Sequence, residues 1–134
     1  MLLIEDNPAD VFLVKEALRT HSVKFDMNWI ADGEQALRAI DRFAPAAPPD
    51  IVVLDLNLPK VDGKELLAHI RRNSTFNKTP VLILTSSDSP SDRRDAAALG
   101  ATCYIQKPPT LSEFLALGGA IKEVAAGGFP DVCL

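Results

Sequence analysis

Short apolar runs alternate along the chain with longer amphipathic segments. Five of these runs predict strands, and they cover residues 2–4, 25–30, 51–54, 81–84 and 102–105. The runs 51–54 and 81–84 are continuously aliphatic and rich in valine and isoleucine, which is typical of parallel strands buried on both faces. The run 25–30 alternates apolar and polar residues, so we expect an edge strand with one face toward water.

Helix-start signals follow the apolar runs. Asn7-Pro8-Ala9-Asp10 places a cap residue first, a proline at the first helical position and an acid three residues after the cap. Four further segments resemble capping boxes, and they begin at Asp32, Asp62, Ser89 and Thr110. A strand–helix unit repeated five times predicts an α/β fold. We expect a doubly wound parallel sheet with helices on both faces, because right-handed crossovers place them there.

Composition and charge narrow the class of protein. The chain has 134 residues, of which 47% are hydrophobic and 24% charged, and its formal net charge is −4. A chain of this size can bury one core without covalent staples. It has no basic run, which argues against nucleic-acid binding, and neither a membrane-spanning apolar run nor a signal peptide. Cys103 and Cys133 fit no metal-site spacing, so we expect free thiols in a reduced, cytoplasmic protein.

Three further interpretations complete the survey of the chain. The Pro/Ala stretch 44–49 is read as a loop from helix to strand, and residues 127–134 as a tail that frays beyond the last helix. Trp29 and the phenylalanines are expected in the core.

Chemically useful side chains follow four of the five predicted strands. Glu5 and Asp6 come after the first, Asp55 after the third, Thr85 after the fourth and Lys107 after the fifth. Sites in open α/β sheets form at the carboxyl ends of the strands. Acids that meet there repel each other unless a cation lies between them, and a hard divalent ion such as Mg²⁺ suits oxygen ligands. Asp55 is then the natural nucleophile for phosphoryl chemistry, since aspartyl phosphates are a known covalent form.

Each of these residues also has an ordinary interpretation. Glu5 and Asp6 could be surface acids favoured by the dipole of the helix that follows. Asp55 could cap the next turn, Thr85 could be a strand-end hydroxyl, and Lys107 could be a solvated lysine. Their coincidence at neighbouring strand ends is what favours a functional site.

The motifs that carry this site match a known family over essentially the whole chain. They are Glu5-Asp6-Asn7, Asp55 within Val53-Leu54-Asp55-Leu56-Asn57-Leu58-Pro59-Lys60-Val61-Asp62-Gly63, Thr85, and Lys107-Pro108. In order and separation they resemble the receiver domain of bacterial response regulators. The chain looks most like the single-domain receivers that partner phytochrome-type histidine kinases. The resemblance implies a flavodoxin-like fold with strand order 2-1-3-4-5, a receiver domain over residues 1–126 and a C-terminal tail over 127–134.

The resemblance also implies the chemistry of the site. Asp55 takes a phosphoryl group from a phosphohistidine on a sensor histidine kinase. Asp6, Asp55 and the backbone carbonyl of Asn57 hold Mg²⁺, and Glu5 assists. Lys107 pairs with Asp55 and later with the phosphoryl oxygens. The chain would then be a phosphoacceptor in a phosphorelay and not an enzyme with a separate substrate, apart from self-catalysed phosphotransfer and autodephosphorylation.

Further residues of the family pattern form the switch. Thr85 donates its hydroxyl to the phosphoryl group and shifts inward, and Tyr104 follows it. The Lys107-Pro108 bond is expected to be cis, which would aim the lysine into the site. Asn57 and Ser87 are the positions whose side chains tune how fast the phosphoryl group hydrolyses. The switch would signal by protein–protein contact, with no nucleic acid or membrane involved.

Two surfaces are candidates for those contacts. On the first helix, Phe12 and Leu13 lie outside the core stripe, and we expect them to dock on the kinase. On the last helix, Leu117 and Val124 widen the apolar arc beyond what the core needs. The core-facing side of that helix is expected to hold Leu111, Phe114, Leu115 and Ile121. The excess arc predicts an exposed strip and a homodimer through this helix.

Three alternatives use the same topology. A haloacid-dehalogenase-like phosphohydrolase needs a second acid two residues after the nucleophile, and this chain has Asn57 there. A flavin binder needs a glycine- and hydroxyl-rich phosphate loop after the first strand, where this chain has Glu5 and Asp6. A degenerate receiver that only binds partners is disfavoured by the intact set of site residues.

Overall fold

The computed structural model describes residues 1–43 and 47–133. Five strands alternate with five α-helices, and their bounds are β1 Leu2–Ile4, α1 Pro8–Thr20, β2 Asn28–Ile30, α2 Gly33–Arg42, β3 Val52–Leu54, α3 Gly63–Arg72, β4 Val81–Thr85, α4 Pro90–Ala98, β5 Cys103–Gln106 and α5 Leu111–Ala125. Two short 3₁₀ helices are added, η1 Ser74–Phe76 and η2 Asp131–Cys133. Of the predicted loop 44–49, residues 44–46 lie outside the described residues, as does position 134 of the predicted tail. Among the described helices, none is long and apolar enough to cross a membrane.

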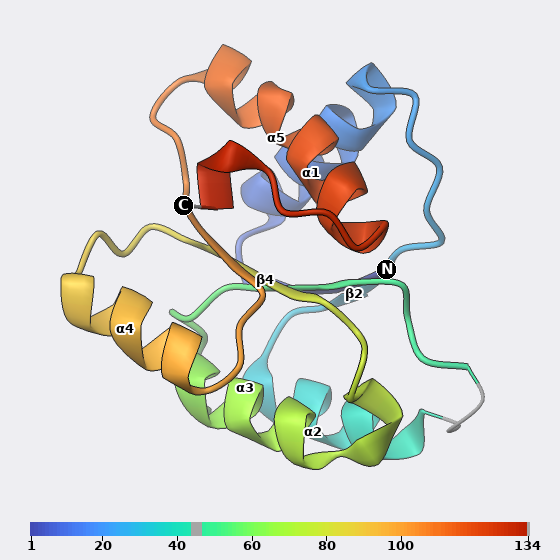
Figure 1. The fold of residues 1–134 in the computed structure, drawn as a ribbon, viewed down its shortest axis with the longest axis vertical. Helices are drawn as coiled ribbons and strands as arrows, with labels where there is room; N and C mark the ends of the chain where they lie inside the picture. The colour runs from blue at the N-terminus through green and yellow to red at the C-terminus, as the bar shows by residue number, and fades with distance from the viewer. Residues whose placement is uncertain (44–46, 134) are drawn as a thin grey trace.

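The strands form one parallel sheet in the order β2-β1-β3-β4-β5, which confirms the predicted topology. Helices α1 and α5 cover one face of the sheet, and α2, α3 and α4 cover the other (Figure 1). Ile4 pairs in register with Leu54, and Leu54 with Ile83. Glu5 and Asp55 therefore emerge at the same level of the sheet's carboxyl end, and Thr85 at the end of β4 lies one residue further along.

The core consists of two apolar layers, one on each side of the sheet. The layer under α1 and α5 contains Leu3, Val53 and Leu82, and the layer under α2 to α4 contains Ile4, Leu54 and Ile83. Successive strand residues thus point to opposite faces, and both faces are buried. This is why β3 and β4 appear in the sequence as unbroken aliphatic runs.

The predicted helix starts are all capped by their own side chains. Each cap oxygen accepts a hydrogen bond from a backbone N–H in the first turn, and the caps are Asn7, Asp32, Asp62, Ser89 and Thr110. These caps satisfy donors that would otherwise lack partners at the beginning of each helix.

The edge strand β2 is shorter than the predicted run, and its tryptophan is not in the core. Trp29 is 43% exposed, and its indole Nε1 donates a hydrogen bond to the backbone carbonyl of Glu5 at 2.7 Å. Phe12 and Phe129 are also exposed. The expectation that the aromatic residues are core holds for buried Phe76 and Phe114 and is wrong for Trp29 and Phe129, whereas exposed Phe12 lies outside the core stripe of α1 as expected.

Helices α1 and α5 approach closely at Gly118. A Cβ atom placed on Gly118 would lie 2.1 Å from the carbonyl oxygen of Ala17 in α1. Glycine lowers helix propensity by about 1 kcal/mol relative to alanine. The backbone contact explains why α5 nevertheless contains a glycine at this position.

The segment 127–133, which we call the strap, leaves α5 and turns back toward β5 (Figure 1). It ends in η2, and Cys133 forms a disulfide bond with Cys103 of β5. The expectations of free thiols and of a fraying tail are therefore wrong. The two cysteines are 30 residues apart, and only the return of the chain along α5 brings them together.

The core-facing side of α5 differs from the predicted one. Leu117 and Val124 are buried, with 6% and 0% exposure, and they pack in one cluster with Cys133 and Ile105. Leu111, expected to face the core, is instead 61% exposed at the first turn of α5. The predicted exposed strip of Leu117 and Val124 is therefore wrong, because both side chains belong to the buried side of α5 together with Phe114, Gly118 and Ile121.

Candidate functional site

Three acids converge at the carboxyl edge of the sheet. Glu5 and Asp6 follow β1, Asp55 follows β3, and one carboxylate oxygen from each lies within 4.8 Å of the other two. Glu5 and Asp55 are buried, whereas Asp6 is exposed. Three hard oxygen donors at this spacing fit the binding of Mg²⁺. The cluster thus contains the carboxylate ligands that the sequence predicted.

Lys107 compensates part of this negative charge. Its Nζ lies 2.9 Å from Glu5 Oε2, 3.0 Å from Asp55 Oδ2 and 2.7 Å from Asp10 Oδ2. The predicted pairing of Lys107 with Asp55 is therefore present. The contact with Asp10 was missed, because an acid in the first helical turn has a sufficient explanation in the helix dipole.

The buried ion pairs shift the pKa values of their members. Burial raises the pKa of Glu5 to about 7; the hydrogen bond from Lys107 opposes this rise and the nearby Asp55 adds to it. Burial alone would lower the pKa of Lys107, but its hydrogen bonds to Asp10 and Glu5 outweigh burial and raise it. Lys107 therefore holds its proton more firmly than an ordinary lysine, and Glu5 gains a proton more readily than an ordinary carboxyl.

The peptide bond between Lys107 and Pro108 is trans. Among the described residues there is no cis peptide bond, so the expected cis bond between Lys107 and Pro108 is wrong. The backbone N–H of Lys107 donates to the carbonyl of Thr85 at 2.7 Å. This bond continues the β4–β5 pairing by one residue and directs the lysine to the strand ends without a cis bond.

Asp55 is held at both carboxylate oxygens. The backbone N–H of Asn57 donates to Oδ1 at 3.0 Å, and Lys107 donates to Oδ2 at 3.0 Å. The side-chain amide of Asn57 in turn donates to Thr85 Oγ1 at 3.3 Å. Asn57 thus links Asp55 to Thr85 across two strands.

The residues expected to form the switch are also connected. Thr85 is fully buried, and its Oγ1 accepts a second, weak hydrogen bond from the backbone N–H of Ser87 at 3.4 Å. Tyr104 is buried as well, and its hydroxyl donates to the carbonyl of Ser87 at 3.1 Å. Ser87 therefore contacts both Thr85 and Tyr104.

Two charged residues extend this network and were not singled out in the sequence. The Arg93 guanidinium lies 4.6 Å from the centroid of the Tyr104 ring, a cation–π distance. Asp92 accepts a hydrogen bond from the Ser87 hydroxyl and forms an ion pair with Lys64. Both belong to the first turns of α4, where surface charge is common and gives no functional signal from sequence alone.

Comparisons with known proteins agree with this geometry. The family profile described as "Response regulator receiver domain" matches residues 1–117. The response regulator Rcp1 of Synechocystis is 33% identical over 126 residues, which cover 92% of this chain and 86% of that protein.

Two solved structures share the fold and the sequence pattern. The phosphorylated cyanobacterial phytochrome response regulator RcpA has a TM-score of 0.83 and 36% identity, covering 93% of this chain and 91% of that one. The Mn²⁺-bound form of Rcp1 has a TM-score of 0.80 and 34% identity, covering 91% and 90%. Both neighbours are response regulators, one phosphorylated and one crystallised with a divalent ion, in keeping with an acidic cluster that fits Mg²⁺. This chain belongs to the receiver domains of response regulators, the signalling proteins of two-component systems.

Proposed function

We propose that Asp55 is the phosphoryl acceptor and that a sensor histidine kinase is the donor. The observation that carries this proposal is the position of Asp55. Among the described acids of the cluster, Asp55 accepts a hydrogen bond from Lys107 and is also linked through Asn57 to the Thr85 hydroxyl. A phosphoryl group on Asp55 would thus meet the metal ligands, a cation and a hydroxyl donor together.

The chemistry needs little beyond positioning and charge. A carboxylate oxygen of Asp55 attacks phosphorus, the bond from phosphorus to the histidine nitrogen breaks, and charge spreads over the three equatorial oxygens. Mg²⁺, held by Glu5, Asp6, Asp55 and the Asn57 carbonyl, would supply positive charge to those oxygens. Lys107 keeps its contacts to Glu5 and Asp10 and turns its remaining N–H toward the phosphoryl group.

Intact mass spectrometry tests this assignment. Incubation with acetyl phosphate and Mg²⁺ is expected to add one phosphoryl group to the wild type and none to Asp55→Asn. Asp41→Asn is the matched control, because Asp41 pairs with His69 between α2 and α3, away from the strand ends. Labelling of Asp55→Asn at the wild-type level would show that another residue accepts the group.

The switch is proposed to run through Ser87. When the Thr85 side chain rotates to bring its hydroxyl to the phosphoryl group, Oγ1 moves away from the Asn57 amide and the Ser87 N–H that now donate to it. The segment around Ser87 then moves, and Tyr104 and Arg93 move with it. Because Asn57 and Ser87 border Asp55 and Thr85, their side chains also control how readily water reaches the phosphoryl group. Apart from its own phosphotransfer and autodephosphorylation, the domain acts by contact with other proteins.

The partner is proposed to be a phytochrome-type kinase in the cytoplasm. RcpA, which is 36% identical, is a phytochrome response regulator by its description. Phe12, on α1 and two residues from Asp10 of the site, is 61% exposed and forms an apolar contact point for the kinase. Leu13 is half-buried against the core and contributes less.

The predicted homodimer remains a proposal in altered form. Leu117 and Val124 are buried in the core, so they cannot form the twofold interface that we predicted. We place self-association on the β5–α5 surface beside Val132 of the strap, in the strap-open protein.

A further inference from the structure

The strap begins with a tight turn at Gly127 and Gly128, after which the chain runs back along α5. Gly127 has φ of +91°, a left-handed conformation that favours glycine. A Cβ on Gly128 would lie 2.6 Å from Glu123 Cγ. The backbone N–H groups of Gly127 and Gly128 donate to the carbonyls of Val124 and Glu123 at 3.0 and 2.8 Å. These bonds close the end of the helix and direct the chain back toward β5.

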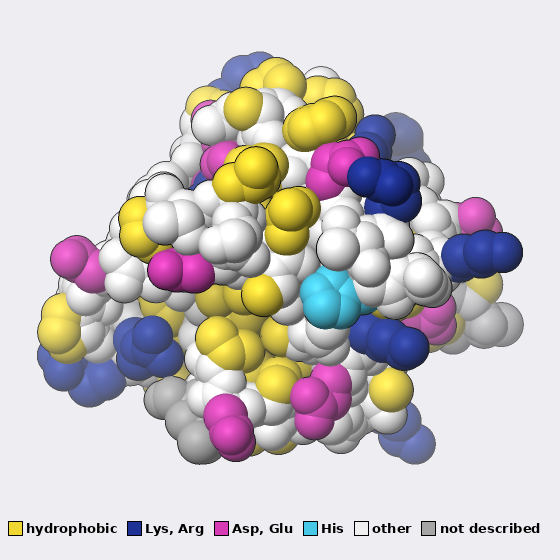
Figure 2. All heavy atoms as spheres, turned by 90° about the horizontal axis from the view of Figure 1, so that it is seen from above, with side chains coloured by type: hydrophobic (Ala, Val, Ile, Leu, Met, Phe, Trp, Pro, Cys, Tyr) yellow, Lys and Arg dark blue, Asp and Glu magenta, His cyan; other side chains and the backbone are white. Residues whose placement is uncertain are grey.

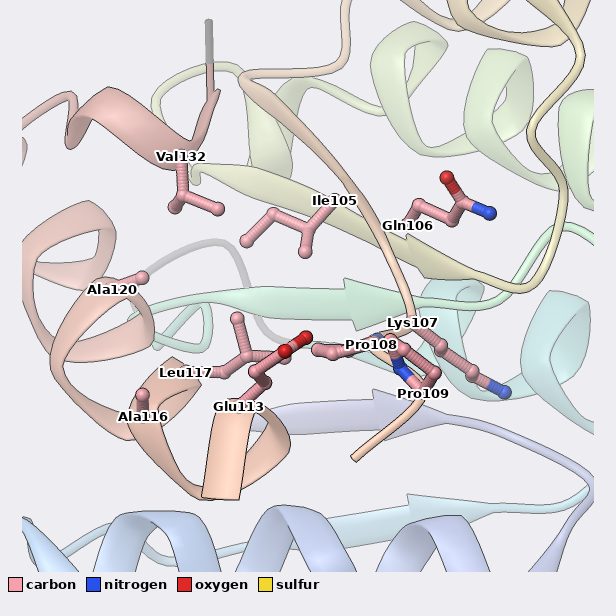
Figure 3. Close-up of a pocket in the computed structure, with 10 residues that line it drawn as sticks. All are labelled: Ile105, Gln106, Lys107, Pro108, Pro109, Glu113, Ala116, Leu117, Ala120 and Val132. Carbon is pink, nitrogen blue, oxygen red and sulfur yellow. The ribbon is translucent and has the colours of Figure 1, made fainter. Parts of the chain in front are cut away.

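The strap covers apolar surface on the α5 side of the sheet. Cys103 and Ile105 of β5 face this side, whereas Tyr104 between them faces the opposite layer. Figure 3 shows Val132 of the strap beside Ile105, with Leu117 and Ala120 of α5 lining the same pocket. The pocket has a volume of about 540 Å³. Seen from the side of α1 and α5, the molecule carries a hollow lined by hydrophobic side chains (Figure 2).

The Cys103–Cys133 disulfide is the main link between the strap and β5. In the described part of the chain, the hydrogen bonds of residues 127–133 stay within the strap or reach the end of α5. No ion pair of the described residues joins the strap to the sheet. Apart from the disulfide, apolar contacts of Val132 and Cys133 remain. A single-turn helix held in this way opens easily once the covalent link is removed.

We propose that Cys103–Cys133 is a redox modification site whose reduction by a dithiol releases the strap from the β5–α5 surface. A thiolate of the reductant attacks Sγ of Cys133, the Cys133–Cys103 bond breaks, and Cys103 leaves as a thiolate that takes up a proton. The second thiol of the reductant then attacks the mixed disulfide. Cys133 is freed as a thiol, and the reductant becomes a cyclic disulfide. Two electrons and two protons pass to the protein, and a disulfide oxidant reverses the step.

Both cysteines are buried, and the structure favours Cys133 as the sulfur attacked because of the element that holds it. Cys133, 7% exposed, lies in the three-residue η2 next to exposed Val132 and Asp131. Cys103 lies inside β5 with 3% exposure and is paired with Leu82 of β4. Local opening of one 3₁₀ turn exposes the first sulfur, whereas exposure of the second requires the sheet edge to open.

Amide hydrogen exchange followed by mass spectrometry tests the proposal. Wild type with dithiothreitol is expected to exchange the amides of residues 127–133 at least about tenfold faster than oxidised wild type. Cys133→Ala is expected to exchange fast with or without reductant, and Asp131→Asn, which keeps both cysteines, to behave like wild type in both conditions. Exchange in α2 and α3 is expected to stay unchanged. Equal protection of the strap in oxidised and reduced wild type would overturn the proposal.

Two further measurements keep the result interpretable. Intact mass of the oxidised protein after alkylation under denaturing conditions should show no alkylated thiol; two alkylated thiols would mean that the bridge does not form. If Cys133→Ala loses helix content, the comparison is made between reduced and oxidised wild type only. Asp55→Asn should keep the full redox response, so a failed phosphoacceptor assignment and a failed strap proposal are separable.

Discussion

At the residue scale, the site holds more negative charge than its one lysine compensates. Lys107 contacts Glu5, Asp10 and Asp55, which uses the three N–H donors of its ammonium group. Asp6 belongs to the acidic cluster but, among the described contacts, not to this ion-pair group. Its charge therefore adds repulsion in the metal-free protein, and the same charge attracts a divalent ion.

This balance predicts opposite effects of Asp6→Ala with and without Mg²⁺. A ligand that binds only the folded state stabilises it by mass action. A tenfold excess of Mg²⁺ over its Kd should raise the melting temperature of the wild type by about 4 °C. Asp6→Ala should lose this increase, and without metal it should melt at or above the wild-type temperature because a repulsive charge is gone.

Thermal unfolding with and without Mg²⁺ provides the measurement, and Asp10→Asn is the control. Asp10 contacts Lys107 but lies outside the acidic cluster, so this variant should keep most of the Mg²⁺ response. An undiminished response in Asp6→Ala would contradict the ligand set.

At the element scale, the contact between α1 and α5 depends on one of two adjacent glycines. A Cβ on Gly118 would lie 2.1 Å from the Ala17 carbonyl oxygen, whereas at Gly119 the nearest atoms are those of the His21 ring at 3.5 Å. Alanine therefore requires the two helices to separate at the first position and finds ordinary contact distance at the second.

Gly118→Ala and Gly119→Ala should accordingly change stability in opposite directions. Overpacking at position 118 is expected to lower the free energy of unfolding by about 2 kcal/mol. The improved helix propensity at position 119 should raise it by up to about 1 kcal/mol. Urea unfolding of both variants decides the matter, and equal destabilisation would show that the glycines serve α5 in some way other than this contact.

Elements with local signals could be predicted from the sequence, and elements that depend on distant contacts could not. Aliphatic runs and cap residues specify strands and helix starts over a few positions, and the strand order of the family places Asp55 beside Lys107. Cys133 gives no local sign that it returns to β5. The apolar arc of α5 is wide enough to face the sheet in two ways, and only packing in three dimensions selects the side with Leu117 and Val124 and leaves Leu111 exposed.

Two site contacts were missed for related reasons. Asp10 reaches Lys107 across 97 positions of sequence, and an acid in a first helical turn already has a local explanation. Trp29 is a large apolar side chain, but it lies on the short edge strand, where its indole N–H finds the Glu5 carbonyl. In both cases an ordinary local interpretation hid a contact made in three dimensions.

At the scale of the whole molecule, one exposed aromatic residue lies beside the site. Phe12→Ala should slow phosphotransfer from the cognate histidine kinase by about tenfold or less while leaving labelling by acetyl phosphate unchanged, because the side chain is 61% exposed and contributes to docking, not to chemistry. Leu111→Ala is the matched control, since Leu111 is equally exposed but lies on α5. Slower labelling by acetyl phosphate as well would indicate a folding defect.

The redox state of the strap is expected to decide whether the protein is a monomer or a dimer. With the disulfide closed, Val132 of the strap lies against the pocket between β5 and α5, and we expect a monomer. With the disulfide reduced, the apolar surface around Ile105, Ala116 and Ala120 becomes available, and a twofold dimer is the simplest assembly that covers it on both copies. Sedimentation velocity at micromolar concentration should therefore show a dimer for reduced wild type and for Cys133→Ala. Adding Ala116→Glu to Cys133→Ala should restore the monomer, because Ala116 is exposed beside the pocket and the interface would then bury an unpaired charge. A dimer in the oxidised wild type, or one that survives Ala116→Glu, would place the interface elsewhere on the molecule.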